Sequence, residues 1–376
     1  MDYKFVTFLY PYGLGVLFKI SAHRPPTTLK VRLLNTFVKK IVNYTNTHNI
    51  FSLLSPTNFP HCIIQSSIMP IISPPVDVEY PDVTATTLAF GSCHKNNIKP
   101  NEPNIWNAIS TLQPDAFLWT GDLVYSPKKG SIASLETLKE EYDKLKQNQT
   151  IGFSDFLLDA EKQGYLKGGY HATLDDHDYG ANDCGNDIPE LRERQNLLLD
   201  FLGVESRDIR RERNGIYSTV TMGKAPHKTK VIFLDTRSGR SKHCIPSVGA
   251  SPYAFGLGSP LACLTRWITA NLNLQNIIPS CRNGKVLDED QWHWLEQHLL
   301  GSDAQVNIVV SSIQVLTTNK LFETWGQFPQ ERTRLLKLLN SVDEKKSVLL
   351  LSGDVSVSPH SMLLFLVSAV LICYVW

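Results

Sequence analysis

The chain lacks an excess of charge of either sign. Its 376 residues include 37 Lys and Arg against 36 Asp and Glu, so the formal net charge is +1. Nucleic-acid-binding proteins usually present a basic surface, because they must neutralise phosphates. The balanced charge therefore argues against a nucleic-acid partner. With 42% apolar residues, the chain has enough for a sizeable core, which predicts a globular protein of one large or two modest domains.

The cysteines lack the spacing of a zinc finger. Seven are present, none forms a Cys-x-x-Cys pair, and their odd number leaves at least one outside any intramolecular disulfide. Two Asn-x-Thr sequons, beginning at Asn43 and Asn148, are compatible with a glycosylated, secreted protein. Disulfide pairing in a secreted chain would draw on four central cysteines: Cys184, Cys244, Cys263 and Cys281.

No apolar run reaches the roughly 20 residues that span a bilayer. Residues 5–20 are largely apolar, but Pro11 and two glycines interrupt them and no clear cleavage site follows. Residues 363–376, about 14 in number, form an apolar stretch that closes the chain. This stretch fits a short membrane anchor, a glycolipid-anchor signal, a buried strand or an altered reading of the gene. We expect the protein in the secretory pathway, outside the cell or at a membrane.

Composition divides the chain into three parts. Residues 1–82 are rich in Pro, Ser, Thr and Asn, which predicts a weakly structured extension and linker. Residues 83–355 alternate apolar runs with segments of helical periodicity, which predicts a folded domain. Within it, 247–284 is rich in Gly, Ser, Pro and Asn and is expected to be a loop insertion. Residues 356–376 form an apolar C-terminal tail. No internal repeat is visible.

Within the domain, short apolar runs alternate with segments of helical periodicity. Strands are predicted at 87–90, 116–119, 170–174, 231–234, 307–310 and 347–351. Helices are predicted at 102–112, 135–147, 188–202, 288–300 and 327–339. This alternation indicates an α/β fold with a layered sheet covered by helices. Because ligands bind beyond the carboxyl ends of such strands, the residues that follow each run form the predicted site.

One of these strand ends concentrates charge. Three carboxylates and an imidazole occupy positions 175–178, directly after an apolar run. Carboxylates this close repel one another at low dielectric unless a cation pairs with them. An Asx-rich turn closed by Gly180 is the structural alternative. The other strand ends add a thiol, a phenol and further polar groups: Cys93, His94, Asp122, Tyr125, Asp235, Arg237, Gln314 and Asp354.

Together these groups predict the hydrolysis of phosphate esters. Carboxylates from separate strands can bracket metal ions, which lower the pKa of a shared water. A neighbouring His can orient the nucleophile or protonate a leaving oxygen. The guanidinium fork of Arg237 matches the geometry of phosphate oxygens. Each residue also has a structural interpretation: Cys93 as a small buried residue, Tyr125 as a packed ring, His94 as a surface residue or one that supports the ligands from behind, and Asp235 as the partner of Arg237 or of a local amide.

Seven motifs, in this order, resemble those of the PhoD-type alkaline phosphatases of the metallophosphatase superfamily. They lie at 90–93, 121–125, 172–180, 234–237, 311–314, 325–332 and 352–355. The resemblance covers about residues 84–355, apart from 247–284. It implies a layered β-sandwich flanked by helices, with a metal site at the carboxyl ends of the strands. It also implies hydrolysis of small phosphate monoesters or diesters by a metal-activated water.

The resemblance assigns roles to individual residues. Asp122 would bridge two metals, and Cys93 and Tyr125 would bind an iron-like ion. Asp176 stands where related enzymes place an Asn ligand, and His177 stands where they place the His that stabilises the transferring phosphoryl group. Members of the family use iron with calcium, and relatives use other divalent pairs; thiolate and phenolate ligands favour a ferric ion, whereas carboxylates suit calcium.

The last motif departs from the family pattern. The resemblance places Asp354 on the final ligand-bearing loop, where the family sequence is Gly-Asp-Val-His, but here Ser356 replaces the His. A hydroxyl is a poorer ligand than an imidazole, so one metal should bind more weakly, and His360 would substitute only if the loop refolds. The family also continues with further strands. A catalytically impaired, membrane-associated or regulatory isoform is therefore the alternative to an active enzyme, and a generic α/β binding protein is a third.

Overall fold

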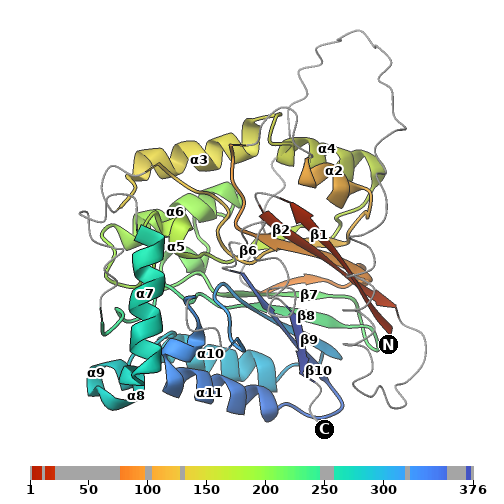
Figure 1. The fold of residues 1–376 in the computed structure, drawn as a ribbon. Helices are drawn as coiled ribbons and strands as arrows, with labels where there is room; N and C mark the ends of the chain where they lie inside the picture. The colour runs from red at the N-terminus through yellow and green to blue at the C-terminus, as the bar shows by residue number, and fades with distance from the viewer. Residues whose placement is uncertain are drawn as a thin grey trace, which may run out of the picture.

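The computed structural model describes residues 2–10, 13–21, 77–97, 104–127, 132–245, 258–317, 322–353 and 370–373. Two mixed sheets lie one above the other, and helices cover the outer side of each (Figure 1). Both parallel and antiparallel strand pairs occur in each sheet. The predicted α/β class is therefore confirmed.

The first sheet has five strands in the order β1-β2-β4-β5-β6. Their bounds are Asp2–Tyr10 for β1, Gly13–Ser21 for β2, Thr87–Ser92 for β4, Ala116–Trp119 for β5 and Tyr170–Ala172 for β6. The last three are parallel, whereas β2 runs antiparallel to both β1 and β4. Residues 1–82 were expected to be weakly structured, and that expectation is wrong for the hairpin β1-β2, which extends the sheet. The remainder of 1–76 lies outside the described residues.

The second sheet has six strands in the order β11-β10-β9-β8-β7-β3. Their bounds are Val370–Cys373 for β11, Ser347–Ser352 for β10, Val306–Ser311 for β9, Thr229–Phe233 for β8, Ser218–Met222 for β7 and Asp77–Tyr80 for β3. The central strands β8, β9 and β10 are parallel, and β11 pairs antiparallel with β10. Four residues of the apolar tail are therefore a strand of this sheet. In the part of the chain that the structure describes, no helix is long and apolar enough to cross a membrane.

Alternating side chains create the core between the sheets. In β4, Leu88 and Phe90 face the second sheet, and in β10 Leu349 and Leu351 face the first, so all four belong to one buried apolar cluster. The intervening side chains point to the opposite faces, as the two-residue period of a strand requires. Each sheet is therefore apolar on both faces and needs a covering layer of helices.

The helices supply those covering layers. Over the first sheet lie α2 (Ile105–Ser110), α3 (Leu135–Gln147), α4 (Phe153–Gln163) and α6 (Leu191–Phe201), and over the second lie α10 (Glu289–Leu300) and α11 (Pro329–Asn340). Side-chain caps start two of them: Ser134 accepts from Thr137 N, and Asp288 accepts from Gln291 N. Trp292 of α10 is fully buried against the sheet, as its apolar spacing predicts.

The segment 247–284 contains helices where a loop insertion was expected. Helix α7 spans Gly258–Asn271, followed by α8 (Leu274–Ile277) and α9 (Pro279–Arg282). A disulfide joins Cys244 to Cys281 and fixes α9 to the chain that follows β8. The remaining short helices are α5 (Asp176–Tyr179), η1 (Ile209–Arg211) and η3 (Trp325–Gln327).

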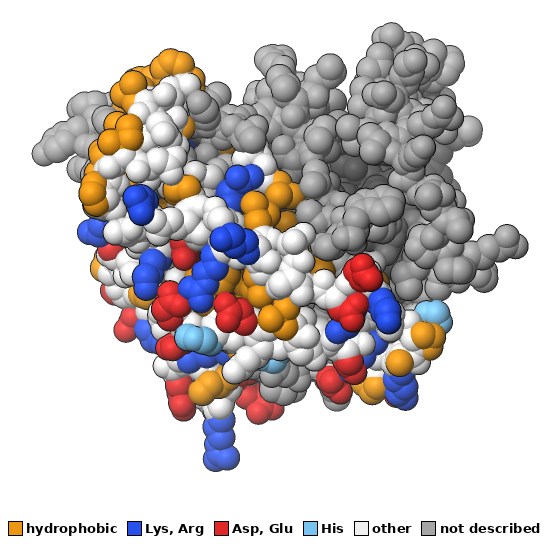
Figure 2. Space-filling view, turned by 90° about the horizontal axis from the view of Figure 1, so that it is seen from below, with side chains coloured by type: hydrophobic (Ala, Val, Ile, Leu, Met, Phe, Trp, Pro, Cys, Tyr) orange, Lys and Arg blue, Asp and Glu red, His pale blue; other side chains and the backbone are white. Residues whose placement is uncertain are grey.

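The surface carries mixed charge. On the face drawn in Figure 2, Lys and Arg side chains are interspersed with Asp and Glu, and the described residues there form no continuous basic field. Both signs of charge are therefore mixed on this face, as they are in the composition.

Candidate metal centre

The carboxyl ends of the parallel strands in both sheets meet at one edge. Asp175, after β6, accepts a hydrogen bond from Ser312 Oγ, after β9, at 2.7 Å. The Ser312 hydroxyl also lies 2.5 Å from that of Thr236, after β8. Polar groups that are far apart in sequence are thus joined across the two sheets, as the strand-end argument predicts.

A strained turn after β5 presents Asp122 to this edge. Gly121 has φ +101°, and a Cβ on it would lie 2.7 Å from the Asp175 Cβ, so only glycine fits. Asp122 itself has φ 54°, an uncommon conformation for a residue with a side chain. The Asp178 carboxylate fixes the turn by accepting the amides of Asp122 at 2.7 Å and Leu123 at 2.8 Å. Backbone strain held in this way is typical of functional sites.

The Asp122 carboxylate is surrounded by groups that sequence analysis chose as ligands. The Tyr125 hydroxyl donates to its Oδ2 at 2.5 Å, and the Cys93 thiol lies 3.6 Å from the same oxygen. The His177 amide donates to Oδ1 at 3.3 Å. The rings of Tyr125 and His177 pack with their centroids 4.1 Å apart. Four predicted site residues are therefore in one place.

The donor atoms fit a metal ion. One ligand atom each from Asp122, Asp176 and His177 lie within 4.8 Å of one another. Burial raises the pKa of Asp122 well above its usual range, and the carboxylates of Asp176 and Asp175 raise it further. Burial likewise raises the pKa of Tyr125, and the Asp122 charge adds to that effect. A bound cation would offset this repulsion and favour the ionised forms of both side chains.

Arg237 lies beneath the acidic groups and not at an open surface. Its side chain is fully buried; Nε donates to Asp175 at 2.6 Å and Nη1 lies 2.8 Å from a Glu323 oxygen. Burial raises the pKa of Asp175, and the Arg237 charge opposes that shift. The geometry favours a counter-ion role over the phosphate-gripping role that the sequence suggested, because moving the guanidinium would leave two buried carboxylates unpaired.

A second group of acidic residues adjoins the first and was missed by sequence reasoning. Asp176, Asp183 and Glu323 also place ligand atoms within 4.8 Å of one another. Here, however, arginines neutralise the carboxylates: Arg240 pairs with Glu323 and Arg266 of α7 pairs with Asp183. We therefore interpret this group as an ion-pair network. No periodicity or motif marks Glu323 or Asp183, since their partners are distant in sequence.

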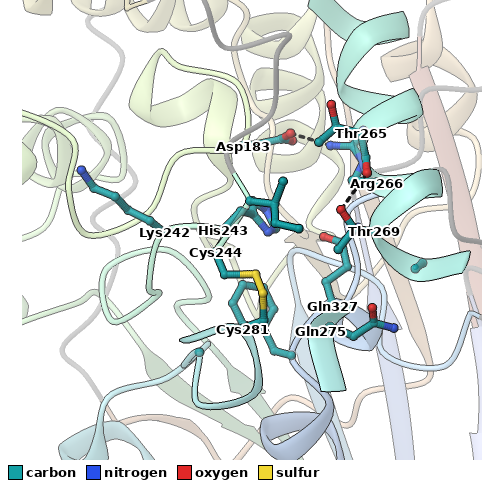
Figure 3. Close-up of a pocket in the computed structure, with 14 residues that line it drawn as sticks. Asp183, Lys242, His243, Cys244, Thr265, Arg266, Thr269, Gln275, Cys281 and Gln327 are labelled. Carbon is teal, nitrogen blue, oxygen red and sulfur yellow. Dashed lines mark hydrogen bonds and ion pairs between the residues drawn. A yellow bond between two sulfur atoms is a disulfide. The ribbon is translucent and has the colours of Figure 1, made fainter. Parts of the chain in front are cut away.

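A small pocket opens beside the network. It is bounded by Asp183, His243, Arg266, Gln327 and the Cys244–Cys281 disulfide (Figure 3). The Asp183 amide donates to Asp176 Oδ2 at 2.7 Å. Asp183, which bounds the pocket, is therefore in direct contact with Asp176 of the candidate centre. The Lys242 side chain extends away from the other labelled residues in Figure 3.

The remaining predicted residues have different outcomes. Asp354, Ser356 and His360 lie outside the described residues. Gly353, directly before Asp354, packs closely on Thr120: a Cβ on Gly353 would lie 2.3 Å from the Thr120 carbonyl oxygen. Asp235 binds local amides, as its structural interpretation predicts.

His94 is buried between Trp106 and Trp119, so its assignment to the surface is wrong. Gln314 is buried, and its main chain bridges to Thr324.

A scan of protein-family models finds no match to this chain, and a search of the curated proteins finds no relative. The resemblance to PhoD-type phosphatases therefore rests on the seven motifs alone. Its functional content is a proposal.

Proposed function

We propose that this chain is a metal-dependent phosphoesterase of the PhoD type. The observation that carries the proposal is the convergence of Asp122, Asp176 and His177, with Cys93 and Tyr125 beside them, at the carboxyl ends of the strands. Two sheets enclosed by helices, with polar strand ends at one edge, are compatible with the metallophosphatase layout that the resemblance implies.

The chain's own residues would divide the work as follows. Asp122 and Asp176 would hold the cations; the thiolate of Cys93 and the phenolate of Tyr125 would favour iron, the carboxylate oxygens would favour calcium, and other divalent pairs are compatible with the same donors. Bound cations supply Lewis acidity at the phosphoryl oxygens and lower the pKa of water. The half-buried His177 imidazole, fixed by Tyr125, is placed to donate a proton to the phosphoryl or leaving oxygen.

Several features of the ester site follow from the same geometry. Asp178 holds the turn that presents Asp122, and Arg237 balances the charge beneath it. The pocket next to Asp183 adjoins the centre through the hydrogen bond from the Asp183 amide to Asp176. The substrate class is accordingly a small phosphate monoester or diester.

Metal content and turnover test the proposal together. The full chain is purified, loaded with iron and calcium, and analysed by mass spectrometry of its metals and by hydrolysis of 4-nitrophenyl phosphate. We expect at least one tightly held ion per chain and turnover that chelation abolishes. A folded protein that retains no metal above background would refute the proposal.

An impaired isoform of the same fold is the second candidate, because Ser356 stands where the family places a His ligand. The variant Ser356→His separates the two. Activity that appears only in Ser356→His would favour the impaired isoform, whereas equal activity in both proteins would favour a competent enzyme. Metal stoichiometry, measured in both, shows whether the added imidazole acts by recruiting an ion.

An oxidising location is proposed on the Cys244–Cys281 disulfide, because such bonds persist in secreted proteins and are rare in reducing compartments. The apolar stretch 363–376 is the proposed route to a membrane, which requires that residues 370–373 leave their pairing with β10. Thiol titration of protein from the culture medium and from the membrane fraction would test both assignments. A reduced, cytosolic chain would contradict them.

A further inference from the structure

We propose that Lys95 selects dianionic phosphate monoesters over monoanionic diesters at this site. The inference rests on the proposed phosphoesterase function, and it narrows the substrate class that the acidic centre leaves open. It starts from an inventory of the positive side chains near Asp122. A phosphoryl group that approaches this cluster needs positive charge on its solvent side.

The arginines near the centre are already committed. Arg237 and Arg240 are fully buried and bind Asp175, Glu323 and main-chain oxygens. Arg266 pairs with Asp183. Turning any of them toward a substrate would strand a buried carboxylate, which is strongly unfavourable. These arginines therefore hold the framework together.

Lys95 differs from them in position and in partners. It lies two residues after Cys93, half-buried, with Nζ 5.4 Å from the centroid of the Tyr125 ring. That ring packs on His177, and its hydroxyl contacts Asp122. Among the residues that the structure describes, no carboxylate lies within ion-pair distance of Lys95. Within the described part of the chain, this ammonium group has no carboxylate partner, and it stands beside Tyr125 and His177 of the proposed site.

The backbone on each side of Lys95 is anchored. The His94 amide donates to the Asp122 carbonyl at 2.9 Å, and the Asn96 side chain donates to Glu141 of α3 at 2.8 Å, both to its carbonyl and to its carboxylate. The loop is therefore fixed to the Asp122 turn and to a helix. Lys95 keeps its place relative to the centre, and only its long side chain needs to adjust to a ligand.

The number of charges on the phosphoryl group decides how strongly Lys95 contributes. Above the second phosphate pKa of about 6, a monoester carries two negative charges, whereas a diester carries one. The Coulomb energy scales with the product of the charges. Loss of the ammonium should therefore reduce the binding free energy of a dianion by twice as much as that of a monoanion. A tenfold loss for a monoester then corresponds to about a threefold loss for a diester.

The test compares Lys95→Met with Lys95→Arg, and uses Lys139→Met as the matched control. Methionine keeps an apolar stem over Tyr125, and Lys139 is an exposed lysine on α3 that pairs with Asp143. The substrates are 4-nitrophenyl phosphate and methyl 4-nitrophenyl phosphate at pH 8. We expect Lys95→Met to lower kcat/KM about tenfold for the monoester and about threefold for the diester, Lys95→Arg to restore most of both, and Lys139→Met to change neither. An equal loss on both substrates, or no loss, would overturn the inference.

A binding measurement keeps this inference separate from the proposed function. The metal-loaded wild-type chain and Lys95→Met are titrated calorimetrically with inorganic phosphate and with dimethyl phosphate. If the affinity for phosphate falls about tenfold in Lys95→Met and the affinity for dimethyl phosphate falls about threefold, Lys95 belongs to an anion subsite. If, in addition, the wild type hydrolyses no ester, the proposed phosphoesterase function is refuted but the role of Lys95 in anion binding stands. If the wild type hydrolyses the ester but Lys95→Met binds phosphate as tightly as the wild type, the proposed function stands and the role of Lys95 is refuted.

Discussion

Asp122 and Asp235 follow strands of different sheets at the same edge of the molecule, are both buried, and are held in opposite ways. Asp235 receives four hydrogen bonds: from the amides of Arg237 and Ser238 in its own loop at 3.0 and 2.9 Å, from the Ser238 hydroxyl at 2.5 Å, and from the amide of Ile216, ahead of β7, at 2.9 Å. Asp122 instead contacts a phenol, a thiol and a single distant amide.

The kind of donor distinguishes a structural carboxylate from a metal-binding one. Main-chain amides are rigid and stabilise an ionised carboxylate without any cation. Burial raises the pKa of Asp122, and the charges of Asp176 and Asp175 raise it further; the hydrogen bond from Tyr125 lowers it but does not offset these effects. Under the proposed function, a bound cation would offset the repulsion around Asp122. Asp235 is complete in the chain alone.

The substitution Asp122→Asn should have the largest effect on function and almost none on folding. The amide keeps the size of the side chain but removes the charge that holds the cations, so kcat/KM for 4-nitrophenyl phosphate should fall by about 10³-fold or more. Without metal, the variant should be at least as stable as the wild type, since it no longer buries a carboxylate among carboxylates. Metal analysis and chemical denaturation in chelator measure the two effects.

The outcome that would break the comparison is a large loss of stability in metal-free Asp122→Asn. Such a loss would mean that Asp122 is as necessary to the fold as Asp235. Retained metal with retained activity would contradict its role as a ligand. Tyr142→Phe offers a control within the same hydrogen-bond system, because it removes only the 3.3 Å contact to Asp178.

The central strands were predictable from sequence because each is an apolar run buried on both faces. The runs at 87–90, 116–119 and 347–351 contain the strands β4, β5 and β10 or most of them. The strand β7 was missed because its five residues, Ser218–Met222, contain no continuous apolar run of the kind used to find the other strands, and α4 was missed between Gly152 and Gly164. Helix α7 lies in a stretch whose Gly, Ser, Pro and Asn content indicated a loop; tertiary context overrides such weak propensities.

The site was predictable where function depends on the residue type that follows a strand. Cys93, Asp122, Tyr125 and the 175–178 cluster converge as the strand-end argument requires. Sequence did not reveal that Asp178 fixes the Asp122 turn or that Glu323 gathers two arginines. Those roles depend on loop geometry, which no local pattern encodes. The burial of Arg237 was missed for the same reason.

A third buried group, His171 of β6, sharpens the comparison because its site disfavours charge altogether. It lies between Tyr80 and Phe233, its Nε2 donates to the Gly168 carbonyl at 2.7 Å, and burial lowers its pKa to about 4. In the unfolded chain the His171 imidazole is protonated near pH 6.5, whereas in the folded chain it is protonated only near pH 4. Stability is therefore lost as pH falls through that window, by about 3 kcal/mol for this group.

The substitution His171→Gln should remove that acid sensitivity. Urea unfolding of the metal-free chain at pH 7 and pH 4.5 should show a smaller loss of stability in the variant than in the wild type, with the exposed His227→Gln as control. An unchanged pH dependence in His171→Gln would show that His171 is protonated as readily in the folded chain as in the unfolded one. His94, whose pKa burial also lowers to about 4, should account for much of the slope that remains.

The smallest effect is expected at Asp235, where the comparison began. Asp235→Asn replaces one accepting oxygen with an NH₂ group that faces main-chain N–H donors, so about 2 kcal/mol of stability should be lost. Metal stoichiometry should not change, because Asp235 is satisfied by amides and not by a cation. Denaturation and metal analysis are compared with Asp82→Asn, which alters only an exposed pair with Lys224 and should leave both unchanged. If Asp235→Asn lost metal before it lost stability, the type of donor would not distinguish structural carboxylates from ligands, and Asp235 would have to be counted among the groups of the centre.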